Sequence, residues 1–366
     1  MSSPDCRMSG AAGAGQVRCG ARPSCSTFPH RGPYDSAALA PHRSAALVTA
    51  VPLGGGEEFD RIRAIARALG DATAGLGDDV AGIPRGAGSA VISVDASVED
   101  VHFRLRWLSF EEIGWRAAAS ALSDLAATAA APSALLAAVV VPSGAGEERL
   151  VEVMSGVGAA AVSVGAKVIG GDLSTGAQWV IAITVLGHAP RRMSRAEARP
   201  GDGIWVTGEL GGAGAALQAW NAGVEPPPGA REAFAHPVPR IHAARWLAAH
   251  GATAMMDLSD GLGGDAGHLA AASQVGVQID LGQVPMHSSV AAAAQRAGQA
   301  PEVFAADAGE DYELLVTLPR EFDGAADFKR DAGLPLTRVG TVTDGRGVRA
   351  TLGGVVQAIR GYEHRL

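Results

Sequence analysis

Short apolar segments that end at aspartates constrain this chain more than any other sequence feature. The clearest is residues 254–262, AMMDLSDGL, in which an apolar run meets two carboxylates. On an extended backbone, residues two apart point to the same side, so Asp257 and Ser259 share a direction and Asp260 lies next to them. Carboxylates at the edge of an apolar segment are unfavourable unless a cation or water compensates them. The segment therefore predicts one half of a magnesium–phosphate site.

The rest of the chain alternates short apolar runs with helical periodicity, which predicts an α/β fold made of two successive halves. The expected strands are 90–95, 134–141, 167–170, 179–187, 203–207, 254–257, 275–281 and 312–318. The expected helices include one from Glu57 to a stop at Gly70, one over 111–131 closed by Pro132, and others over 148–164 and 240–249. Asp344-Gly345 predicts a hairpin near the C-terminus.

A length of 366 residues favours two domains over one. Residues 1–55 are rich in Ser, Gly, Ala, Pro and Arg without periodicity, which predicts a disordered extension. A polar, basic stretch around 191–200 predicts the boundary between a first domain over 56–190 and a second over 191–366. All three cysteines lie in the first 25 residues, so the expected folded part has no disulfide and no thiol nucleophile. This cysteine distribution is compatible with the reducing cytoplasm, which is the expected location.

Composition excludes several classes of partner. The net charge of −8 argues against nucleic-acid binding. The most apolar segment, 134–141, is far shorter than the roughly 18 residues that a membrane span needs. The chain contains only Lys167 and Lys329 as lysines. Phosphate groups would therefore be neutralised by divalent metal, arginine and backbone amides.

Carboxylates recur where apolar segments stop, at Asp79, Asp95, Asp124, Asp172, Asp257, Asp260 and Glu310-Asp311. Taken singly, each is explained more readily as a helix cap or a turn residue. Asp124 resists that explanation, because it lies inside an alanine-rich helical run where no cap is needed. Oxygen ligands without clustered His or Cys favour magnesium and phosphoryl transfer. Neither a P-loop nor the protein-kinase motifs are present.

Seven short motifs occur in order: Gly77-Asp78-Asp79, Ser93-Val94-Asp95, residues 98–103 (VEDVHF), residues 122–127 (LSDLAA), Gly170-Gly171-Asp172, residues 257–262 (DLSDGL) and residues 309–314 (GEDYEL). Together they resemble the motif series of the thiamine-monophosphate kinase family, within the aminoimidazole-ribonucleotide-synthetase (PurM-like) superfamily. The resemblance runs from about residue 56 to the C-terminus.

The resemblance implies a PurM-like N-terminal α/β domain that forms a dimeric β-barrel across a homodimer, plus a C-terminal α/β domain. It implies ATP-dependent phosphorylation of thiamine monophosphate to thiamine diphosphate by direct in-line transfer, with several Mg²⁺ ions. It assigns metal ligation to Asp79, Ser93, Val94 (through its carbonyl), Asp95, Asp124, Asp172, Asp257 and Asp260, with Asp124, Asp95 and Asp257 catalytic. It assigns ATP contacts to Gly171, Asp172, Arg195 and Ser259, and thiamine phosphate contacts to His102, Glu310 and Ile359.

Three positions depart from the family pattern. Leu173 stands where threonine is usual, and Val164 lies near a place where relatives carry an aromatic that packs on the nucleotide. Ile359 stands where an aromatic often stacks on the thiamine, a role that Tyr362 would take over. Without the motifs, His102 is explained as a buried core histidine and Arg195 as a solvated linker arginine.

Other functions remain open at this point. They are another ATP-using superfamily member such as a selenophosphate-synthetase-like enzyme, a nucleotide-binding protein without turnover, and a metal-dependent phosphatase. The first would need a catalytic cysteine and a paired lysine that have no counterpart here. The phosphatase would deliver the phosphate to water.

Overall fold

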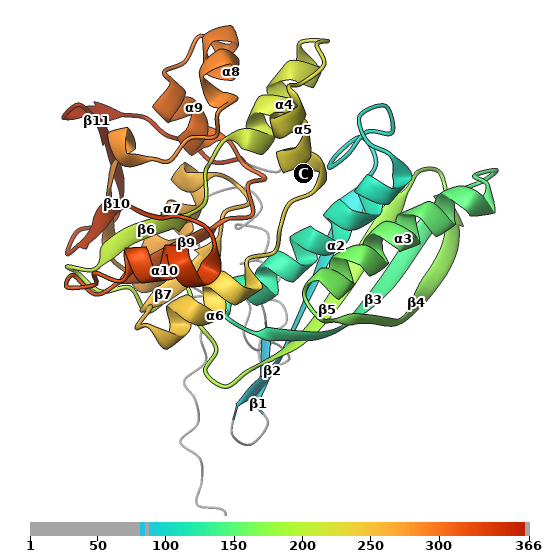
Figure 1. The fold of residues 1–366 in the computed structure, drawn as a ribbon, viewed down its shortest axis with the longest axis horizontal. Helices are drawn as coiled ribbons and strands as arrows, with labels where there is room; N and C mark the ends of the chain where they lie inside the picture. The colour runs from blue at the N-terminus through green and yellow to red at the C-terminus, as the bar shows by residue number, and fades with distance from the viewer. Residues whose placement is uncertain (1–80, 85–87, 363–366) are drawn as a thin grey trace, which may run out of the picture. The chain divides into compact units, whose positions relative to one another are not determined.

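The computed structural model describes residues 81–84 and 88–362 (Figure 1). Three predictions fall outside the described residues: the extension over 1–55, the helix from Glu57 to Gly70, and the ligand role of Asp79.

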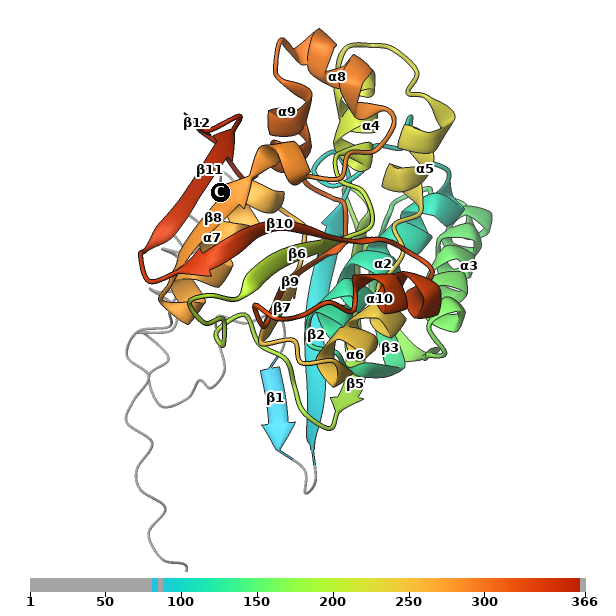
Figure 2. The same cartoon turned by 60° about the vertical axis from the view of Figure 1, so that its left-hand side comes forward.

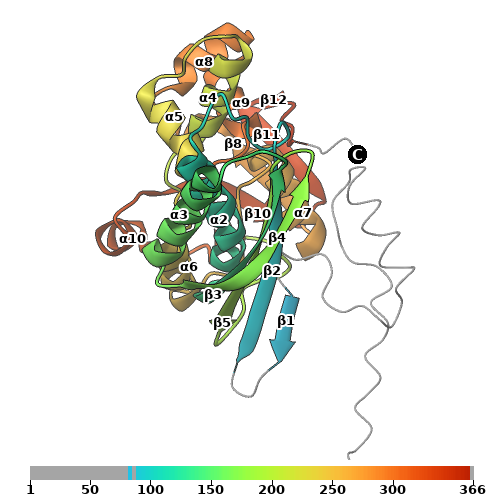
Figure 3. The same ribbon diagram turned by 90° about the vertical axis from the view of Figure 1, so that its right-hand side faces the viewer.

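The described part of the N-terminal half is one sheet with two helices. Its strands are β1 (Ala81–Pro84), β2 (Ser89–Val98), β3 (Ala131–Pro142), β4 (Lys167–Gly176) and β5 (Val180–Ala189), in the order β1-β2-β5-β3-β4. β3 and β4 pair in parallel and are joined by helix α3 (Glu147–Ser163), whereas β5 is antiparallel to both β2 and β3. Helix α2 (Phe110–Ala127) lies beside α3 against the same sheet (Figures 1 and 3).

Helix α2 is buried on almost every side, which its composition explains. It begins with a capping box in which the Ser109 hydroxyl accepts from Glu112 N and the Glu112 carboxylate accepts from Ser109 N. From Ile113 onward it is dominated by alanines, which pack closely without a polar face. The helix contacts β2 and β5 on one side and α5, α6 and β7 of the C-terminal half on the other.

The two helices of this layer cross where glycines allow backbones to touch. A Cβ on Gly114 of α2 would lie 1.8 Å from Val153 O, and one on Gly156 of α3 would lie 1.9 Å from Glu111 O. Only glycine fits at either position, so these two residues set the distance between the helices.

The C-terminal half is built on a second sheet with the order β12-β11-β8-β10-β6-β9-β7 (Figure 2). Its strands are β6 (Gly203–Thr207), β7 (Ala254–Asp257), β8 (Gly276–Asp280), β9 (Leu314–Leu318), β10 (Leu336–Thr343), β11 (Gly347–Leu352) and β12 (Val355–Gln357). Its α-helices are α4 (Gly212–Asn221), α5 (Pro228–Ala235), α6 (Ile241–Ala249), α7 (Leu262–Ser273), α8 (Val290–Ala297), α9 (Pro301–Asp307) and α10 (Ala325–Ala332), with a 3₁₀ turn at Leu281–Gln283. Helices α4, α5, α8 and α9 gather together, whereas α6 packs with α10 (Figures 1 and 2).

Several expected boundaries were wrong. The helix expected over 111–131 ends at Ala127, because Thr128 caps it and Ala129 turns the chain with a φ of +55°. Pro132 instead lies in β3 beside an irregularity in the pairing with β5, where a missing N–H is tolerated.

Two further expectations were wrong for topological reasons. Asp95 and Asp172 lie inside β2 and β4 and do not end these strands. Asp344-Gly345 does reverse the chain, but β10 and β11 do not form a hairpin. β8 lies between them, antiparallel to β10 and parallel to β11.

Within the part of the chain that the structure describes, no helix is both long enough and apolar enough to cross a bilayer.

The helix crossing predicts opposite effects for two glycines of α3. Gly156→Ala should lower the free energy of unfolding by about 1–3 kcal/mol, because the added methyl group overlaps the α2 backbone. Gly158→Ala meets nothing within 4 Å and should raise it by roughly 0.5–1 kcal/mol through helix propensity. Urea unfolding of the three proteins measures both changes, and equal effects of the two substitutions would contradict the packing role.

Candidate active site

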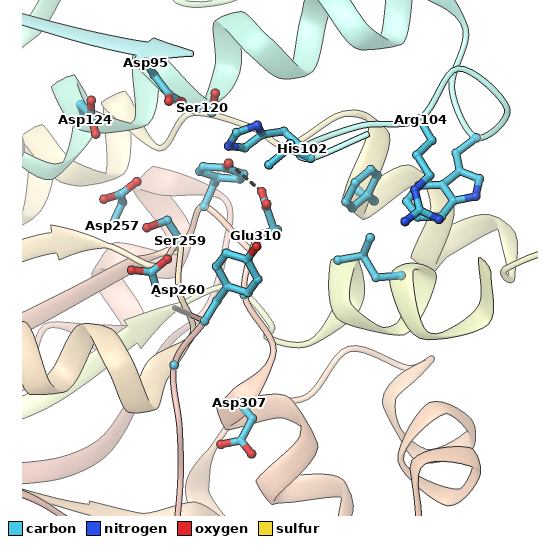
Figure 4. Close-up of a pocket in the computed structure, with 18 of the residues that line it drawn as sticks. Asp95, His102, Arg104, Ser120, Asp124, Asp257, Ser259, Asp260, Asp307 and Glu310 are labelled. Atoms are coloured by element: carbon cyan, nitrogen blue, oxygen red, sulfur yellow. Dashed lines mark hydrogen bonds between the residues drawn. The ribbon is translucent and has the colours of Figure 1, made fainter. Parts of the chain in front are cut away.

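A cavity of about 630 Å³ brings together residues from both sheets and the loops beside them. Its lining includes Val94, Asp95, His102, Asp124, Asp257, Ser259, Asp260, Glu310 and Tyr362 from the sequence-based predictions. It also includes Val101, Arg104, Trp107, Ser120, Leu217, Asn221, Phe234, Asp307, Gly309, Tyr312 and Gly361. Figure 4 shows Asp95 and Asp124 approaching from one side, with Asp257, Ser259 and Asp260 opposite them.

Strand β2 and helix α2 position the first pair of carboxylates. Alternate β2 residues face α2, beginning with the buried Val91, so Ser93 and Asp95 share that face. Ser93 Oγ donates to Asp124 Oδ2 at 2.5 Å, which joins the strand to the helix at this point. Ser120, one helical turn before Asp124, lines the same cavity. Asp124 thus caps no helix end and lines the cavity from the helix interior.

A loop at the end of β7 positions the second group. Strand β7 ends at Asp257, and residues 258–261 lead into α7. Leu258 and Ser259 are bound to the segment 309–313: Glu310 N donates to Ser259 O at 2.7 Å, and Tyr312 N donates to Leu258 O at 2.8 Å. Asp260 O accepts from Tyr362 N at 2.8 Å. The loop is therefore held between two distant segments.

Two glycines make this close approach possible. Gly261 has a φ of +98°, and a Cβ on it would lie 2.8 Å from Ala308 O. A Cβ on Gly309 would lie 2.5 Å from Ser259 O. Each side chain would separate the two segments that present Ser259, Asp260 and Glu310.

The carboxylates of the cavity fit a magnesium ion that is also bound by a phosphate ligand. Among residues 81–84 and 88–362, no three acidic, His or Cys side chains are already arranged to hold a metal ion. Asp95, Asp124, Asp257 and Asp260 nevertheless line one cavity as oxygen donors on opposing walls. Mg²⁺ commonly takes one or two carboxylates and completes its coordination with water and substrate phosphates. The donor set therefore fits magnesium bound together with a phosphate ligand.

The wall beyond the carboxylates carries His102 and Glu310. His102 Nδ1 accepts a hydrogen bond from Val98 N at 3.1 Å, which fixes the ring in the turn after β2. Glu310 accepts from the Tyr312 hydroxyl at 2.7 Å and pairs with Arg116 of α2. Burial raises the pKa of Tyr312 well above its usual value, so its hydroxyl stays protonated and acts as the donor.

The far end of the cavity is aromatic and basic. The Arg104 guanidinium lies 4.6 Å from the Trp107 ring centre, and Trp107 stacks on Trp220 at 5.0 Å. Trp107, Leu217 and Phe234 add apolar surface to the lining. Figure 4 shows Arg104 well separated from Asp124 and Asp257. The cavity thus has an acidic end and an aromatic end that carries positive charge.

Not every expected site residue reaches this cavity. Gly171 and Asp172 are exposed on the outer strand β4, Arg195 is buried, and Ile359 packs against the hydrophobic core. Tyr362 does line the cavity and is 58% exposed.

Sequence reasoning missed several lining residues. Ser120 could have been predicted, because it lies four residues before Asp124 on the same helix face. For Arg104 and Trp107 the only indication in the sequence was the combination of positive charge and an aromatic ring within residues 104–107. Leu217, Asn221 and Phe234 come from α4 and α5, whose approach to the site no local pattern indicates.

Asp307 is another unexpected lining residue. Burial raises the pKa of its carboxyl, although the carboxylate also accepts from Arg360 N at 2.7 Å. This bond ties α9 to the C-terminal segment that carries Tyr362.

Arg195 lies against α7, where its carbonyl accepts from Ser273 Oγ at 2.7 Å. Burial, and to a smaller extent the charge of Arg195, lowers the pKa of His268 on α7 from 6.5 to about 4. The folded protein therefore keeps His268 neutral at pH values where the unfolded chain binds a proton.

The His268 contribution to stability should be complete above pH 6.5 and should be lost as the pH falls from 6.5 to about 4. The total change is about 3 kcal/mol, from 1.36 kcal/mol per pKa unit. His268→Gln should show a correspondingly flatter loss of unfolding free energy in urea between pH 7 and pH 4.5. Parallel curves for the variant and the wild type would contradict a depressed pKa.

Comparisons with known proteins identify the family of this chain. Residues 77–189 match the AIR synthase related protein N-terminal domain, and residues 199–353 match the C-terminal domain of the same family. The thiamine-monophosphate kinase of Halobacterium salinarum is 36% identical over 305 residues, which cover 82% of this chain and 99% of that protein. The thiamine-monophosphate kinase of Bacillus subtilis is 32% identical over 302 residues, covering 79% and 92%. The solved structure of AaThiL complexed with AMPPCP and TMP has a TM-score of 0.76 and 29% identity, covering 85% of this chain and 97% of that one. The chain belongs to the thiamine-monophosphate kinase family.

Proposed function

We propose that this kinase transfers the γ-phosphoryl group of ATP to the phosphate of thiamine monophosphate. An oxygen of the substrate phosphate attacks the γ-phosphorus in line, and the bond between that phosphorus and the β–γ bridging oxygen breaks. The products are thiamine diphosphate and ADP, with no covalent enzyme intermediate. Family membership and the acidic cavity together support this reaction.

The observation that carries the proposal is the opposition of two carboxylate groups across one cavity. Asp95 and Asp124 come from β2 and α2, whereas Asp257 and Asp260 come from the loop after β7. Two phosphate groups that approach each other need their negative charges neutralised from both sides. Among the described residues that line the cavity, the one arginine, Arg104, lies well away from these carboxylates (Figure 4). Divalent ions bound by the carboxylates are therefore the fitting partners of the phosphates.

We assign magnesium ligation to Asp95, Asp124, Asp257 and Asp260, with Ser93, the Val94 carbonyl and Asp172 from the N-terminal sheet, and Asp79 beyond the described residues. When bound, Mg²⁺ would neutralise charge on the phosphate oxygens. Ser93 holds Asp124 in place through its hydrogen bond. Asp124, Asp95 and Asp257 remain the proposed catalytic residues.

The substrate assignments follow the two ends of the cavity. Gly171, Asp172, Arg195 and Ser259 are proposed ATP contacts; three of them lie outside the cavity lining, so ATP would have to extend beyond it. His102, Glu310 and Ile359 are the proposed contacts of the acceptor, with Tyr362 as the aromatic neighbour. We also propose that the chain divides into domains over 56–190 and 191–366 and that the protein is cytoplasmic.

The test of the reaction is incubation of the purified protein with ATP, magnesium and thiamine monophosphate. Chromatography should show thiamine diphosphate appearing in equal amount to ADP. ATP consumption with release of inorganic phosphate and no thiamine diphosphate would indicate a phosphatase and overturn the proposal.

Asp124→Asn should reduce kcat by on the order of 100-fold or more, because the variant loses a negative charge at the proposed metal site with almost no change in shape. Asp327→Asn is the matched control: its exposed side chain pairs with Arg330 on α10, away from the cavity. The control should retain wild-type turnover, and both proteins should unfold like the wild type. An Asp124→Asn enzyme with full activity would remove Asp124 from the metal site.

We also propose that the N-terminal sheet is the surface of a homodimer. Val94 and Leu136 lie in register with Thr184 between them, on the face of the sheet opposite α2 and α3. Val94 is 64% exposed and Leu136 is 37% exposed, and Ile169 on the outer strand β4 is 63% exposed. Apolar side chains gathered in this way on a strand face favour burial against a second copy.

Leu136→Glu should weaken this dimer, because it places a charge within the apolar face. Val162→Glu on the exposed side of α3 changes charge equally but should leave the assembly intact. Sedimentation velocity across a concentration series distinguishes the two variants. A wild-type protein that stays monomeric at micromolar concentrations would overturn the dimer.

A further inference from the structure

Arg116 of α2 does not line the cavity, yet it contacts three residues that do. Its guanidinium pairs with Glu310 Oε2 and donates to Phe234 O at 2.5 Å. The same group lies 3.7 Å from the Phe234 ring centre and 5.8 Å from that of Tyr312. Arg116 thus stands behind the wall formed by Phe234, Glu310 and Tyr312.

Because Arg116 is buried, these contacts are the partners that stabilise its charge. The residue is only 4% exposed, so its charge depends on the Glu310 carboxylate and on the aromatic and carbonyl partners. Arginine suits this place because its planar group can donate in two directions while it stacks on a ring.

Glu310 is held by two donors on one oxygen. Both the Arg116 guanidinium and the Tyr312 hydroxyl, the latter at 2.7 Å, bond to Oε2. Within residues 81–84 and 88–362, Oε1 is left as the oxygen that a ligand can engage. Glu310 and Tyr312 both have positive φ, at +69° and +51°, a conformation that these residues rarely adopt. Such backbone is kept where surrounding contacts maintain it.

We infer that Arg116 and Tyr312 are positioning residues that orient Glu310 toward the acceptor substrate. By binding Oε2, they direct Oε1 to the ring portion of thiamine monophosphate, which carries a cationic thiazolium and an aminopyrimidine donor. This inference rests on the proposed function. It assigns Arg116 to acceptor binding and not to the ATP end, because its partners lie on the acceptor wall.

Three substitutions test the inference at graded strength. Tyr312→Phe removes one hydrogen bond to Glu310, Arg116→Lys keeps the charge but loses the planar fork, and Arg116→Met removes both. Tyr312→Phe and Arg116→Lys should raise KM for thiamine monophosphate by about 10-fold, the size expected from losing a hydrogen bond to a charged group. Arg116→Met should have a larger effect, with Lys partly restoring the function. KM for ATP should stay within about 2-fold, and kcat should fall less than KM rises.

Arg240→Lys is the matched control. Arg240 also bonds a buried glutamate of the same segment, Glu313, at 2.5 Å and 2.9 Å, but neither residue lines the cavity. This variant should lower thermal stability without changing KM for thiamine monophosphate. Equal KM changes in Arg240→Lys and Arg116→Lys would reduce Arg116 to a general structural role.

Calorimetric titration with thiamine monophosphate alone separates this inference from the proposed reaction. An active wild type whose Tyr312→Phe and Arg116→Lys variants bind thiamine monophosphate unchanged overturns only the role of Arg116 and Tyr312. A wild type that neither binds nor phosphorylates thiamine monophosphate overturns the proposed function and this inference with it. If Arg116→Met does not fold, the other two variants still decide the question.

Discussion

The close burial of helix α2 is the constraint on which the remainder of the structure depends. Its alanines let it touch the N-terminal sheet, α3 and the C-terminal elements α5, α6 and β7 at the same time. Gly114 and Gly156 fix its distance from α3. A helix packed on all sides has little freedom to shift or rotate. The side chains that it presents, Asp124 and Arg116, are therefore placed by packing before any ligand arrives.

The segment 309–313 shows how five successive residues divide the work of supporting a site. Gly309 allows contact with the loop after β7, and Glu310 faces the cavity. Asp311 accepts from Gly211 N at the start of α4, and burial raises its pKa well above the usual value. Tyr312 bonds back to Glu310, and Glu313 is tied to Arg240 and Thr207. The other four residues thereby orient or support Glu310, the proposed contact of the acceptor.

Local patterns were sufficient to predict much of this molecule. The alternation of strands and helices and the helical placement of Asp124 follow from periodicity. The resemblance of the motif series to a known family implied that Asp95, Asp124, Asp257 and Asp260 share one site, and all four line one cavity. Strand neighbours were not predictable, because the insertion of β8 between β10 and β11 is decided by long-range pairing.

Residues that contribute through tertiary contact were equally invisible in the sequence. No local pattern distinguishes Arg116, since its partners Phe234 and Glu310 lie 118 and 194 positions away. Helix α2 carries Arg116 and Asp124 eight positions apart, a rise of about 12 Å along its axis. The helix therefore fixes the distance between Arg116, which pairs with Glu310, and Asp124 at the proposed metal end. On the proposed assignments, an acceptor with its phosphate much nearer to its ring system, or much farther from it, would not engage both ends at once, so this helix would contribute to selection by length.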